Sequence, residues 1–596
     1  MTLHETLKKY FGYDNFRHNQ EEIIERTIAG ENTLVIMPTG GGKSMCYQLP
    51  ALLLPGITLV VSPLIALMQD QVESLVQNGI PAIALNSSIE AKNEAAVMQD
   101  IKKQKYKLIY VSPEKALSTS FIEHLKDITI SLIAVDEAHC VSIWGNDFRK
   151  DYAQLDQLLN LFKSTPKIAL TATADKTTQQ DILKQLNLHD AKTFLASFER
   201  KNITTKVWPA NDRINKILKF INKQEGNSGI IYCLSRKSTE EVSSKLKAKG
   251  INAHHYHAAI PAEKKAQIQR DFLNDKTQVI CATIAFGMGV DKSNIRWVIH
   301  YNVPKNIESY YQEIGRAGRD GSEAEAILFA GLGDLRVQQD FVEKSDASKE
   351  FKAIQMAKLN RMQAFIFASN CRTNFVLNYF GEFRSEACGH CDNCASPIQS
   401  FDGTILAQKA LSASKRTNEK AGVYLIIDIL RGARTQEIFN NHLDQIKTYG
   451  TGKDISKEDW FHYIMQMVNQ GLFEIDFANR SVLKTTPLSD EVLFSGKEVL
   501  LTKQEHVQKF SPAPKAKATV ANVDKKLLKL LKAKRKEIAQ EAAVPAYVVF
   551  SDRTLEDMSG KQPSTPDQLL DVTGVGEHKL NKYGWDFIGV IRDYKN

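Results

Sequence analysis

The segment TLVIMPTGGGKSMCYQLP, residues 33–50, carries the clearest structural pattern in the chain. It begins with a short apolar run, passes through a glycine-rich turn and ends in a stretch of helical pattern. Glycines in such a turn let backbone N–H groups face phosphate oxygens, Lys43 supplies positive charge to the β and γ phosphates, and Ser44 offers a hydroxyl to Mg²⁺. Met37 stands where the G-x-x-x-x-G-K-[ST] pattern has its first glycine, so a chance glycine turn is the alternative. The segment predicts the strand, phosphate loop and helix of a nucleotide-binding α/β domain.

Similar apolar runs rich in β-branched residues recur through about residue 335 and alternate with amphipathic stretches. The first series lies at 33–37, 57–62, 107–112, 132–136 and 167–171, and the second at 229–233, 278–283 and 297–301. Strands interleaved with helices indicate parallel sheets. Because the series restarts after Trp208 and Pro209, it favours two α/β domains in tandem over one.

Length and composition indicate a folded multidomain chain. The 596 residues suggest about four domains at roughly 150 residues each. Hydrophobic residues make up 43% and charged residues 24%, as in globular proteins. No window approaches the ~18 uninterrupted apolar residues of a membrane span, and the first 16 residues lack the pattern of a signal peptide. We therefore expect a chain that stays in the cytosol and does not contact a membrane.

Positive charge is concentrated near the C-terminus. The formal net charge is +8, and residues 503–536 hold 11 basic against 2 acidic residues, a surplus of +9, which leaves the rest of the chain at about −1 (8 minus 9). Global charge therefore does not argue that the bulk of the protein binds nucleic acid, and such a role must rest on local patches.

Two further segments have the chemistry of phosphoryl transfer. LIAVDEAH places Asp136 and Glu137 at the end of a predicted strand, where a Mg²⁺ ligand and a water-activating base are needed. QEIGRAGRDG places Arg316 and Arg319 on one face of a predicted helix in the second domain, so charge stabilisation would require closure between the domains. Solvated acids and a surface helix end are the plainer alternatives.

The eight cysteines fall into two sets. Cys46, Cys140, Cys233 and Cys281 lie in apolar runs, as expected of small buried side chains. Cys371, Cys388, Cys391 and Cys394 form C-x16-C-x2-C-x2-C, which suits a structural, tetrahedral Zn²⁺ site. His390 is an alternative ligand, and an iron–sulfur cluster is an alternative to zinc.

An aromatic segment, CVSIWGNDFRKDY at 140–152, follows the acidic pair directly. An exposed loop with Trp144, Phe148, Arg149 and Tyr152 would combine stacking surfaces with positive charge, as single-strand binding requires. A buried aromatic cluster that braces the two domains is the alternative.

Taken in order, these motifs resemble those of a superfamily 2 helicase. ALTATA at 169–174 and ATIAFGMGVDK at 282–292 complete the set, and FGYDNFRHNQ near the start with the cysteine cluster makes the chain similar to the bacterial RecQ family of DNA helicases. The resemblance covers essentially all of the chain. It implies two tandem RecA-like domains at 1–201 and 202–337, a helical zinc-binding module at 338–402, a winged-helix domain at 403–505, a basic linker at 506–522 and a small all-α HRDC domain at 523–596.

The resemblance also implies roles for individual residues. The base would be bound by Tyr13, which stacks on adenine, with Arg17 and Gln20, and the phosphates by Thr39, Gly40, Gly41, Gly42, Lys43 and Ser44. It implies Mg²⁺ on Ser44 and Asp136, Glu137 as general base, and Arg319 as arginine finger beside Arg316. DNA would contact Trp144, Phe148 and Arg149. The run LNYFGE before CGHCDNC matches the family's zinc module and favours Cys371, Cys388, Cys391 and Cys394 as ligands, with His390 outside the set.

Two accessory segments have roles implied in the same way. A hairpin about Asn479 in the winged helix would hold duplex DNA ahead of the separation point. The turn TGVGEHKL at 573–580 either binds phosphate backbone or serves as a helical packing turn.

The implied function is an ATP- and Mg²⁺-dependent DNA helicase. It would translocate 3′ to 5′ on single-stranded DNA and separate duplexes in recombination, repair, the SOS response and replication-fork processing. Its partners would be single-stranded and duplex DNA, with single-stranded-DNA-binding protein as a candidate, and it would act as a cytoplasmic, nucleoid-associated monomer. The alternatives are an RNA helicase, a duplex translocase that does not separate strands, and an ATP-gated DNA-binding clamp.

Overall fold

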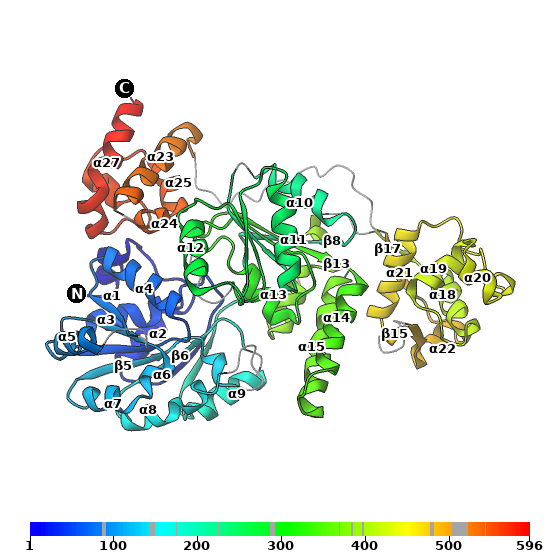
Figure 1. Cartoon of the computed structure of the whole chain (residues 1–596), viewed down its shortest axis with the longest axis horizontal. Helices are drawn as coiled ribbons and strands as arrows, with labels where there is room; N and C mark the ends of the chain where they lie inside the picture. Colours follow the sequence, from blue (N-terminus) through cyan, green and yellow to red (C-terminus); the bar gives the residue numbers. More distant parts are fainter. Residues whose placement is uncertain are drawn as a thin grey trace.

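The computed structural model describes residues 1–85, 91–142, 149–174, 176–224, 226–286, 292–368, 370–382, 386–395, 399–476, 482–503, 523–542 and 544–595. Two α/β domains lie side by side, a helical domain that holds the C-terminus covers one side of both, and a separate lobe lies at the opposite end (Figure 1).

The first α/β domain is built on a sheet of parallel strands in the order β3-β4-β2-β5-β6-β1-β7. The strands are β1 (Thr33–Ile36), β2 (Ile57–Val61), β3 (Ala82–Leu85), β4 (Leu108–Val111), β5 (Ile130–Val135), β6 (Lys167–Thr171) and β7 (Lys192–Leu195). Its helices are α1 (Leu3–Phe11), α2 (Gln20–Ile28), α3 (Met45–Leu53), α4 (Ile65–Gln77), α5 (Ala91–Lys102), α6 (Pro113–Ala116), α7 (Thr119–Leu125), α8 (Leu155–Leu161) and α9 (Lys176–Gln185), with short 3-10 turns η1 (Ala138–Val141) and η2 (Tyr152–Gln154).

The second α/β domain repeats this plan with the strand order β10-β11-β9-β12-β13-β8, again parallel. Its strands are β8 (Ile203–Pro209), β9 (Gly229–Tyr232), β10 (Ala253–Tyr256), β11 (Val279–Ala282), β12 (Trp297–His300) and β13 (Ala324–Ala330). Its helices are α10 (Arg213–Ile221), α11 (Arg236–Lys247), α12 (Ala262–Leu273) and α13 (Ile307–Ile314). The predicted pair of parallel α/β domains is confirmed.

The burial of the central strands explains why the sequence predicted them. Residues on both faces of β1 and β2 have almost no exposed surface, because helices cover each side of the sheet. Parallel strands buried on both faces are continuous apolar runs instead of alternating ones. The edge strand β7 has the burial pattern exposed, exposed, buried, exposed, and no strand was predicted there.

The chain then enters a helical module formed by α14 (Leu332–Glu343), α15 (Lys349–Ile366), α16 (Arg372–Tyr379) and α17 (Asp392–Ala395). It packs on the end of the first α/β domain, where Phe380 stacks on Phe198 with ring centroids 4.2 Å apart, and on the second, where the Asp392 carboxylate accepts a 2.8 Å bond from Val207 N.

The separate lobe is the winged-helix domain (Figure 1). Its elements are β14 (Gln399–Asp402), α18 (Thr404–Arg416), α19 (Val423–Arg431), α20 (Gln436–Asn440), the 3-10 turn η3 (Leu443–Gln445), α21 (Lys457–Asn469), β15 (Phe473–Asp476), β16 (Val482–Thr485), α22 (Pro487–Phe494) and β17 (Leu500–Lys503). Antiparallel β15 and β16 form the arms of the predicted hairpin, whose turn at Asn479 lies outside the described residues. Because β14 pairs with β17, this fold unit begins slightly before the boundary predicted at 403.

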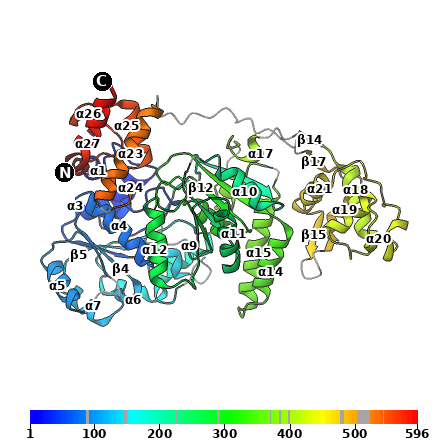
Figure 2. The ribbon, with the colours of Figure 1, turned by 45° about the horizontal axis from the view of Figure 1, so that its top comes forward.

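The C-terminal domain consists of α23 (Lys525–Glu541), α24 (Ala546–Val549), α25 (Asp552–Lys561), α26 (Pro566–Leu570) and α27 (Glu577–Lys595) around its own apolar core. The predicted linker at 506–522 lies outside the described residues. Figure 2 shows this domain seated above α1 and α4. None of the described helices is long and apolar enough to cross a membrane.

Candidate active site and metal centre

The phosphate loop connects β1 to α3, as predicted. Gly40 and Gly42 adopt φ values of 78° and 86°, a left-handed conformation that suits glycine. Lys43 Nζ folds back across the loop and donates a 3.1 Å hydrogen bond to the Met37 carbonyl. The loop is therefore held in a tight turn at the start of a helix, the arrangement that presents backbone N–H groups to an anion.

The acidic pair follows β5 at the same edge of the sheet. The Asp136 carboxylate accepts a 2.9 Å bond from Glu137 N, and Glu137 itself has a left-handed backbone with φ 49°. His139 Nδ1 lies 3.3 Å from a Glu137 carboxylate oxygen and 2.9 Å from Thr171 Oγ1 at the end of β6. The histidine thus connects the DEAH segment to the ALTATA segment.

Arg316 and Arg319 lie in turns beyond α13, because the helix ends at Ile314 with Gly315 as its cap. The expectation that both arginines share a helical face is wrong: successive turns at 315–320 carry them instead. Both arginines line the same cavity as the phosphate loop. Burial raises the pKa of the neighbouring Tyr232 to about 12, and the charge of Arg316 opposes that rise.

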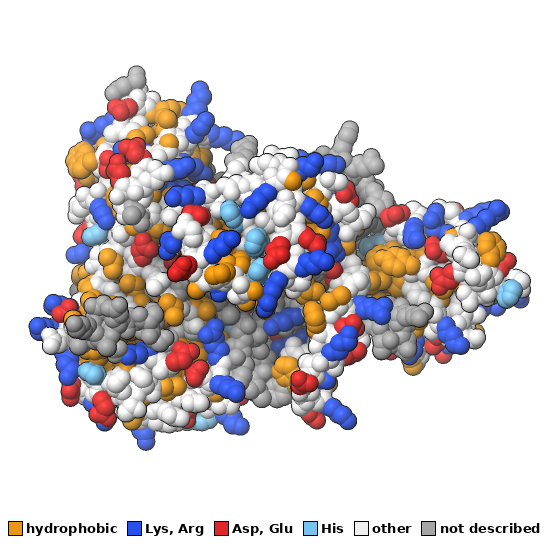
Figure 3. Space-filling model, in the orientation of Figure 1, with side chains coloured by type: hydrophobic (Ala, Val, Ile, Leu, Met, Phe, Trp, Pro, Cys, Tyr) orange, Lys and Arg blue, Asp and Glu red, His pale blue; other side chains and the backbone are white. Residues whose placement is uncertain are grey.

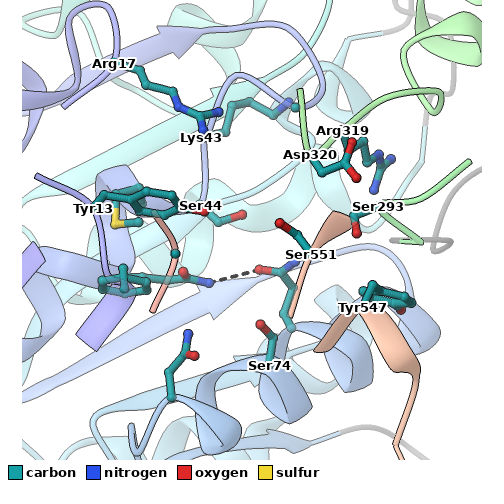
Figure 4. Close-up of a pocket in the computed structure, with 18 of the residues that line it drawn as sticks. Tyr13, Arg17, Lys43, Ser44, Ser74, Ser293, Arg319, Asp320, Tyr547 and Ser551 are labelled. Carbon is teal, nitrogen blue, oxygen red and sulfur yellow. Dashed lines mark hydrogen bonds between the residues drawn. The ribbon is translucent and has the colours of Figure 1, made fainter. Parts of the chain in front are cut away.

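A cavity of about 400 Å³ collects the predicted residues. Figure 4 shows side chains from three parts of the chain around this space, with Tyr13 and Ser44 from the first domain and Arg319 from the second. Of the residues predicted for nucleotide binding and hydrolysis, all but Gly41 line it: Tyr13, Arg17, Gln20, Thr39, Gly40, Gly42, Lys43, Ser44, Asp136, Glu137, Arg316 and Arg319. Hydroxyl, carboxylate and phosphate-facing backbone groups in one cavity fit a nucleotide with Mg²⁺.

The base-recognition segment contacts the phosphate loop. The Arg17 guanidinium lies 5.6 Å from the Tyr13 ring centroid. Gln20 Oε1 accepts a 2.8 Å bond from Arg17 N, and Gln20 Nε2 donates a 3.0 Å bond to the Gly42 carbonyl. Gln20 therefore joins this segment to the phosphate loop directly.

Sequence reasoning missed Arg200. Its guanidinium donates to the Thr39 carbonyl of the phosphate loop and to the carbonyls of Gly315, Ala317 and Gly318 at 3.3, 3.1 and 3.1 Å. One side chain between the domains thus fixes the backbone on both sides of the cavity. The segment SFERKNI has no pattern that identifies it, since the partners are carbonyls from distant parts of the chain.

The C-terminal domain forms another wall of the cavity, contributing Tyr547, Val548, Ser551, Arg553, Thr554, Thr573, Gly574 and Lys579. Figure 4 shows Tyr547 and Ser551 entering from its ribbon. The turn at 573–576 packs on α1, because Gly574 N donates a 2.9 Å bond to the Gly12 carbonyl. Of the two predicted roles for this turn, the structure shows the packing role.

Of the predicted DNA loop, Trp144 and Phe148 lie outside the described residues. Arg149 donates a 2.7 Å bond to the Pro63 carbonyl, close to the start of α4. Tyr152 is fully buried and its hydroxyl donates to the Asp136 carbonyl at 2.9 Å. The prediction of an exposed stacking role for Tyr152 is wrong, because its ring is part of the core beneath the acidic pair.

The four clustered cysteines lie together in an arrangement that could hold a metal ion. The Sγ atoms of Cys371, Cys388, Cys391 and Cys394 lie within 4.8 Å of one another, and that of Cys394 lies 3.3 Å from Cys391 and 3.8 Å from Cys388. Tetrahedral Zn²⁺ with Zn–S bonds of ~2.3 Å separates its sulfurs by roughly 3.8 Å, so the cluster fits. His390 is not in the group of four donors that lie within 4.8 Å of one another, and its Nδ1 lies 2.8 Å from the Cys388 carbonyl.

The fold and the cavity define a class of protein: an ATPase motor core of two RecA-like domains with a DEAD/DEAH box. Family comparisons agree. The DEAD/DEAH box helicase family matches residues 17–182, the helicase conserved C-terminal domain 212–321, the RecQ zinc-binding family 332–395, the RQC domain 397–509 and the HRDC domain 524–591.

Curated relatives match along the whole chain. The ATP-dependent DNA helicase RecQ of Pasteurella multocida is 41% identical over 100% of this chain and 94% of its own length, and that of Haemophilus influenzae is 41% identical over 99% and 95%. RecQ of Bacillus subtilis is 39% identical over 99% and 98%. The chain belongs to the RecQ family of ATP-dependent DNA helicases.

Proposed function

We propose that this enzyme uses ATP and Mg²⁺ to translocate 3′ to 5′ on single-stranded DNA and to separate duplexes in recombination, repair, the SOS response and replication-fork processing. The observation that carries the proposal is the single cavity shared by the phosphate loop, the acidic pair and the two arginines of the second domain.

The proposed roles follow from position. Lys43 and the loop amides of Thr39, Gly40, Gly41 and Gly42 hold the phosphates, and Ser44 with Asp136 holds Mg²⁺, which neutralises phosphate charge when bound. Glu137 accepts the proton of the attacking water, with His139 orienting its carboxylate. Arg319, beside Arg316, stabilises the charge that develops on the transferred phosphoryl group.

Base recognition would be coupled to the loop through Gln20. Both of its amide atoms are already bonded, one to Arg17 N and the other to the Gly42 carbonyl. Pairing with an adenine edge requires Gln20 to exchange at least one of these bonds, while Tyr13 stacks on the ring. Nucleotide binding would therefore alter the restraint on the phosphate loop.

Coupling to DNA would begin at the loop after Glu137. The Arg149 guanidinium donates to the Pro63 carbonyl, and the Arg149 backbone N–H donates to the Cys140 carbonyl. A DNA strand bound at this loop would therefore lie within a few residues of the general base. Trp144 and Phe148 remain predicted stacking residues. Base stacking contributes ~1–3 kcal/mol per base, so Trp144→Ala should weaken DNA-stimulated hydrolysis without changing ATP affinity.

The remaining proposals concern context. We propose that the enzyme acts as a monomer, which sedimentation analysis of the full chain would test. Family membership supports a cytoplasmic, nucleoid-associated protein, with single-stranded-DNA-binding protein as a candidate partner to be tested by co-sedimentation.

Strand displacement on duplexes with a 3′ tail, a 5′ tail or no tail, with and without ATP, tests the proposal. We expect ATP-dependent separation of the 3′-tailed DNA alone, and none with Lys43→Ala, which should still bind DNA. Separation from the 5′ tail would refute the polarity, and equal activity on RNA duplexes would indicate an RNA helicase. Hydrolysis without separation would indicate a translocase, and ATP-dependent binding without phosphate release a clamp.

A further inference from the structure

The second RecA-like domain carries a second group of metal-binding side chains. Glu240, His255 and His257 each offer one donor atom, and these atoms lie within 4.8 Å of one another. None of the three lines the nucleotide cavity, and none belongs to the cysteine centre. Figure 3 shows histidine side chains at the surface of this domain.

The fold explains the grouping. His255 lies in β10, an edge strand of the second sheet, and His257 follows the strand directly. Alternate residues of an extended chain project to the same side, so these two side chains face together. Tyr256 lies between them and packs against Phe286, with ring centroids 4.7 Å apart. Glu240 comes from α11, the helix that packs beside β10.

The geometry is close to that of a coordinated metal. The two imidazole rings stack with centroids 5.5 Å apart and planes inclined by 14°, and His257 Nε2 lies 3.0 Å from a Glu240 oxygen. Zn²⁺ with bonds of ~2.1 Å separates tetrahedral donors by roughly 3.4 Å. The 3.0 Å pair is already within that spacing, and the widest pair needs to close by about 1.4 Å at most.

The environment also suits a metal site. His257 is 94% buried by surface area, whereas about half of the Glu240 side chain is exposed to solvent. A carboxylate and two imidazoles give three protein ligands, and the exposed side leaves room for water as the fourth. A simple ion pair between His257 and Glu240 would not require the stacked His255.

We propose that Glu240, His255 and His257 bind a second divalent transition metal, of the Zn²⁺ or Co²⁺ class, separate from the cysteine-bound zinc. The ion would tie α11 to the edge strand β10. The site is independent of the proposed helicase function, since none of its ligands lines the nucleotide cavity.

Titration of the tag-free, metal-depleted full chain with Co²⁺ tests this proposal. We expect two equivalents per chain, of which only the cysteine-bound one shows thiolate-to-metal charge-transfer absorption. His255→Ala and Glu240→Gln should weaken the other site at least about tenfold, because changes even to residues behind a metal ligand cost about 10–100-fold in affinity. His254→Ala, at the adjacent position on the other face of β10, is the matched control and should keep two equivalents.

Three results would overturn the proposal: saturation of the wild-type chain at one equivalent, an unchanged second affinity in His255→Ala, or an equal loss in His254→Ala. The thiolate band serves as an internal check of folding in every variant. Measurement of bound zinc by mass spectrometry on the same proteins gives a second readout, with two ions expected in the wild type and one in His255→Ala.

Discussion

Two seams border the nucleotide cavity, and they are held together by different chemistry. The seam between the RecA-like domains is made by Arg200, which donates to backbone carbonyls on both sides, and by Tyr311, whose hydroxyl donates to the Phe198 carbonyl at 2.7 Å. Gly315 fits there because a Cβ would lie 1.9 Å from Thr39 Oγ1.

The seam to the HRDC domain is made mainly by side chains. The Asp552 carboxylate lies between Arg296 at 2.9 Å and Arg535 at 2.8 Å, and Gln77 accepts 2.8 and 2.9 Å bonds from Lys582 and Tyr583. Burial raises the pKa of Asp552, but the charges of Arg535 and Arg296 outweigh this effect and hold the pKa below its usual range.

The difference is instructive. The first seam fixes the backbone of the loops that carry the proposed catalytic residues, so its loss should act on chemistry. The second rests on charges at the edge of the cavity, so its loss should act on domain docking and leave chemistry in place.

The largest effect is expected for Arg319→Ala. An arginine that stabilises the transition state contributes about 10³–10⁵-fold to phosphoryl transfer, so DNA-stimulated kcat should fall by that order with DNA affinity retained. Steady-state phosphate release measures kcat, and substitution of the exposed Arg236 at the start of α11, Arg236→Ala, is the control. A decrease of less than about tenfold would remove Arg319 from the transition state.

Arg200→Lys comes next. Lysine keeps the charge but cannot reach four carbonyls with a fork, so the loops on both sides lose their common restraint. We expect kcat to fall about 10²-fold, as misplacement of a catalytic group does. Unchanged hydrolysis with a lowered melting temperature would show that the Arg200 contacts only stabilise the fold. It would contradict the claim that the two seams differ in their effect on catalysis.

Asp552→Asn tests the other seam. Removing one partner of a buried ion pair lowers the free energy of unfolding by about 3–5 kcal/mol. We expect the lower end of this range because Arg296 also pairs with Asp320. Hydrogen exchange should increase at the contacts of α1, α4 and α27, while ATP hydrolysis changes less than threefold. A double-mutant cycle with Arg296→Met isolates the pair. Loss of hydrolysis equal to that of Arg200→Lys would contradict the comparison.

Lys579 gives the smallest effect. Burial lowers the pKa of Lys579 to about 8, and its Nζ donates to the Val548 carbonyl at 2.8 Å. Between pH 8 and the ordinary lysine value of ~10.4, the unfolded chain binds more protons at this residue, so the stability of the HRDC domain should rise with pH across that window. Thermal melts as a function of pH measure this change in stability for the wild type, Lys579→Met and the exposed control Lys536→Met. The increase in stability with pH should be absent only from Lys579→Met.

Much of the site was predictable because its signals are local. MPTGGGKS and DEAH each lie within a few residues of a buried strand, and parallel strands present their carboxyl ends at one edge of the sheet. The four cysteines of the metal site likewise lie within 24 residues of one another, so their spacing alone identifies them as ligands. Arg200 was not predictable, since carbonyl partners carry no side-chain signature.

The missed elements have a related cause. Within the two α/β domains, strands β3, β7, β8, β10 and β13 were not predicted. Of these, β3, β7, β8 and β10 are the edge strands of the two sheets, where an uncovered side weakens the apolar pattern, and β13 lies next to the edge strand β8. Trp208 and Pro209, taken as a break between domains, are the end of β8, which pairs with β13. Edge strands obtain their conformation from the neighbour they pair with.

The sequence alone determined the two α/β domains, the phosphate loop, the acidic pair and the cysteine ligands, because short-range pattern and residue chemistry suffice for each. The tertiary structure decided that Arg200 joins the two domains, that Tyr152 belongs to the core, and that the HRDC domain forms a wall of the nucleotide cavity. These depend on contacts between residues more than 100 positions apart or on burial by distant segments, and only packing brings such groups together.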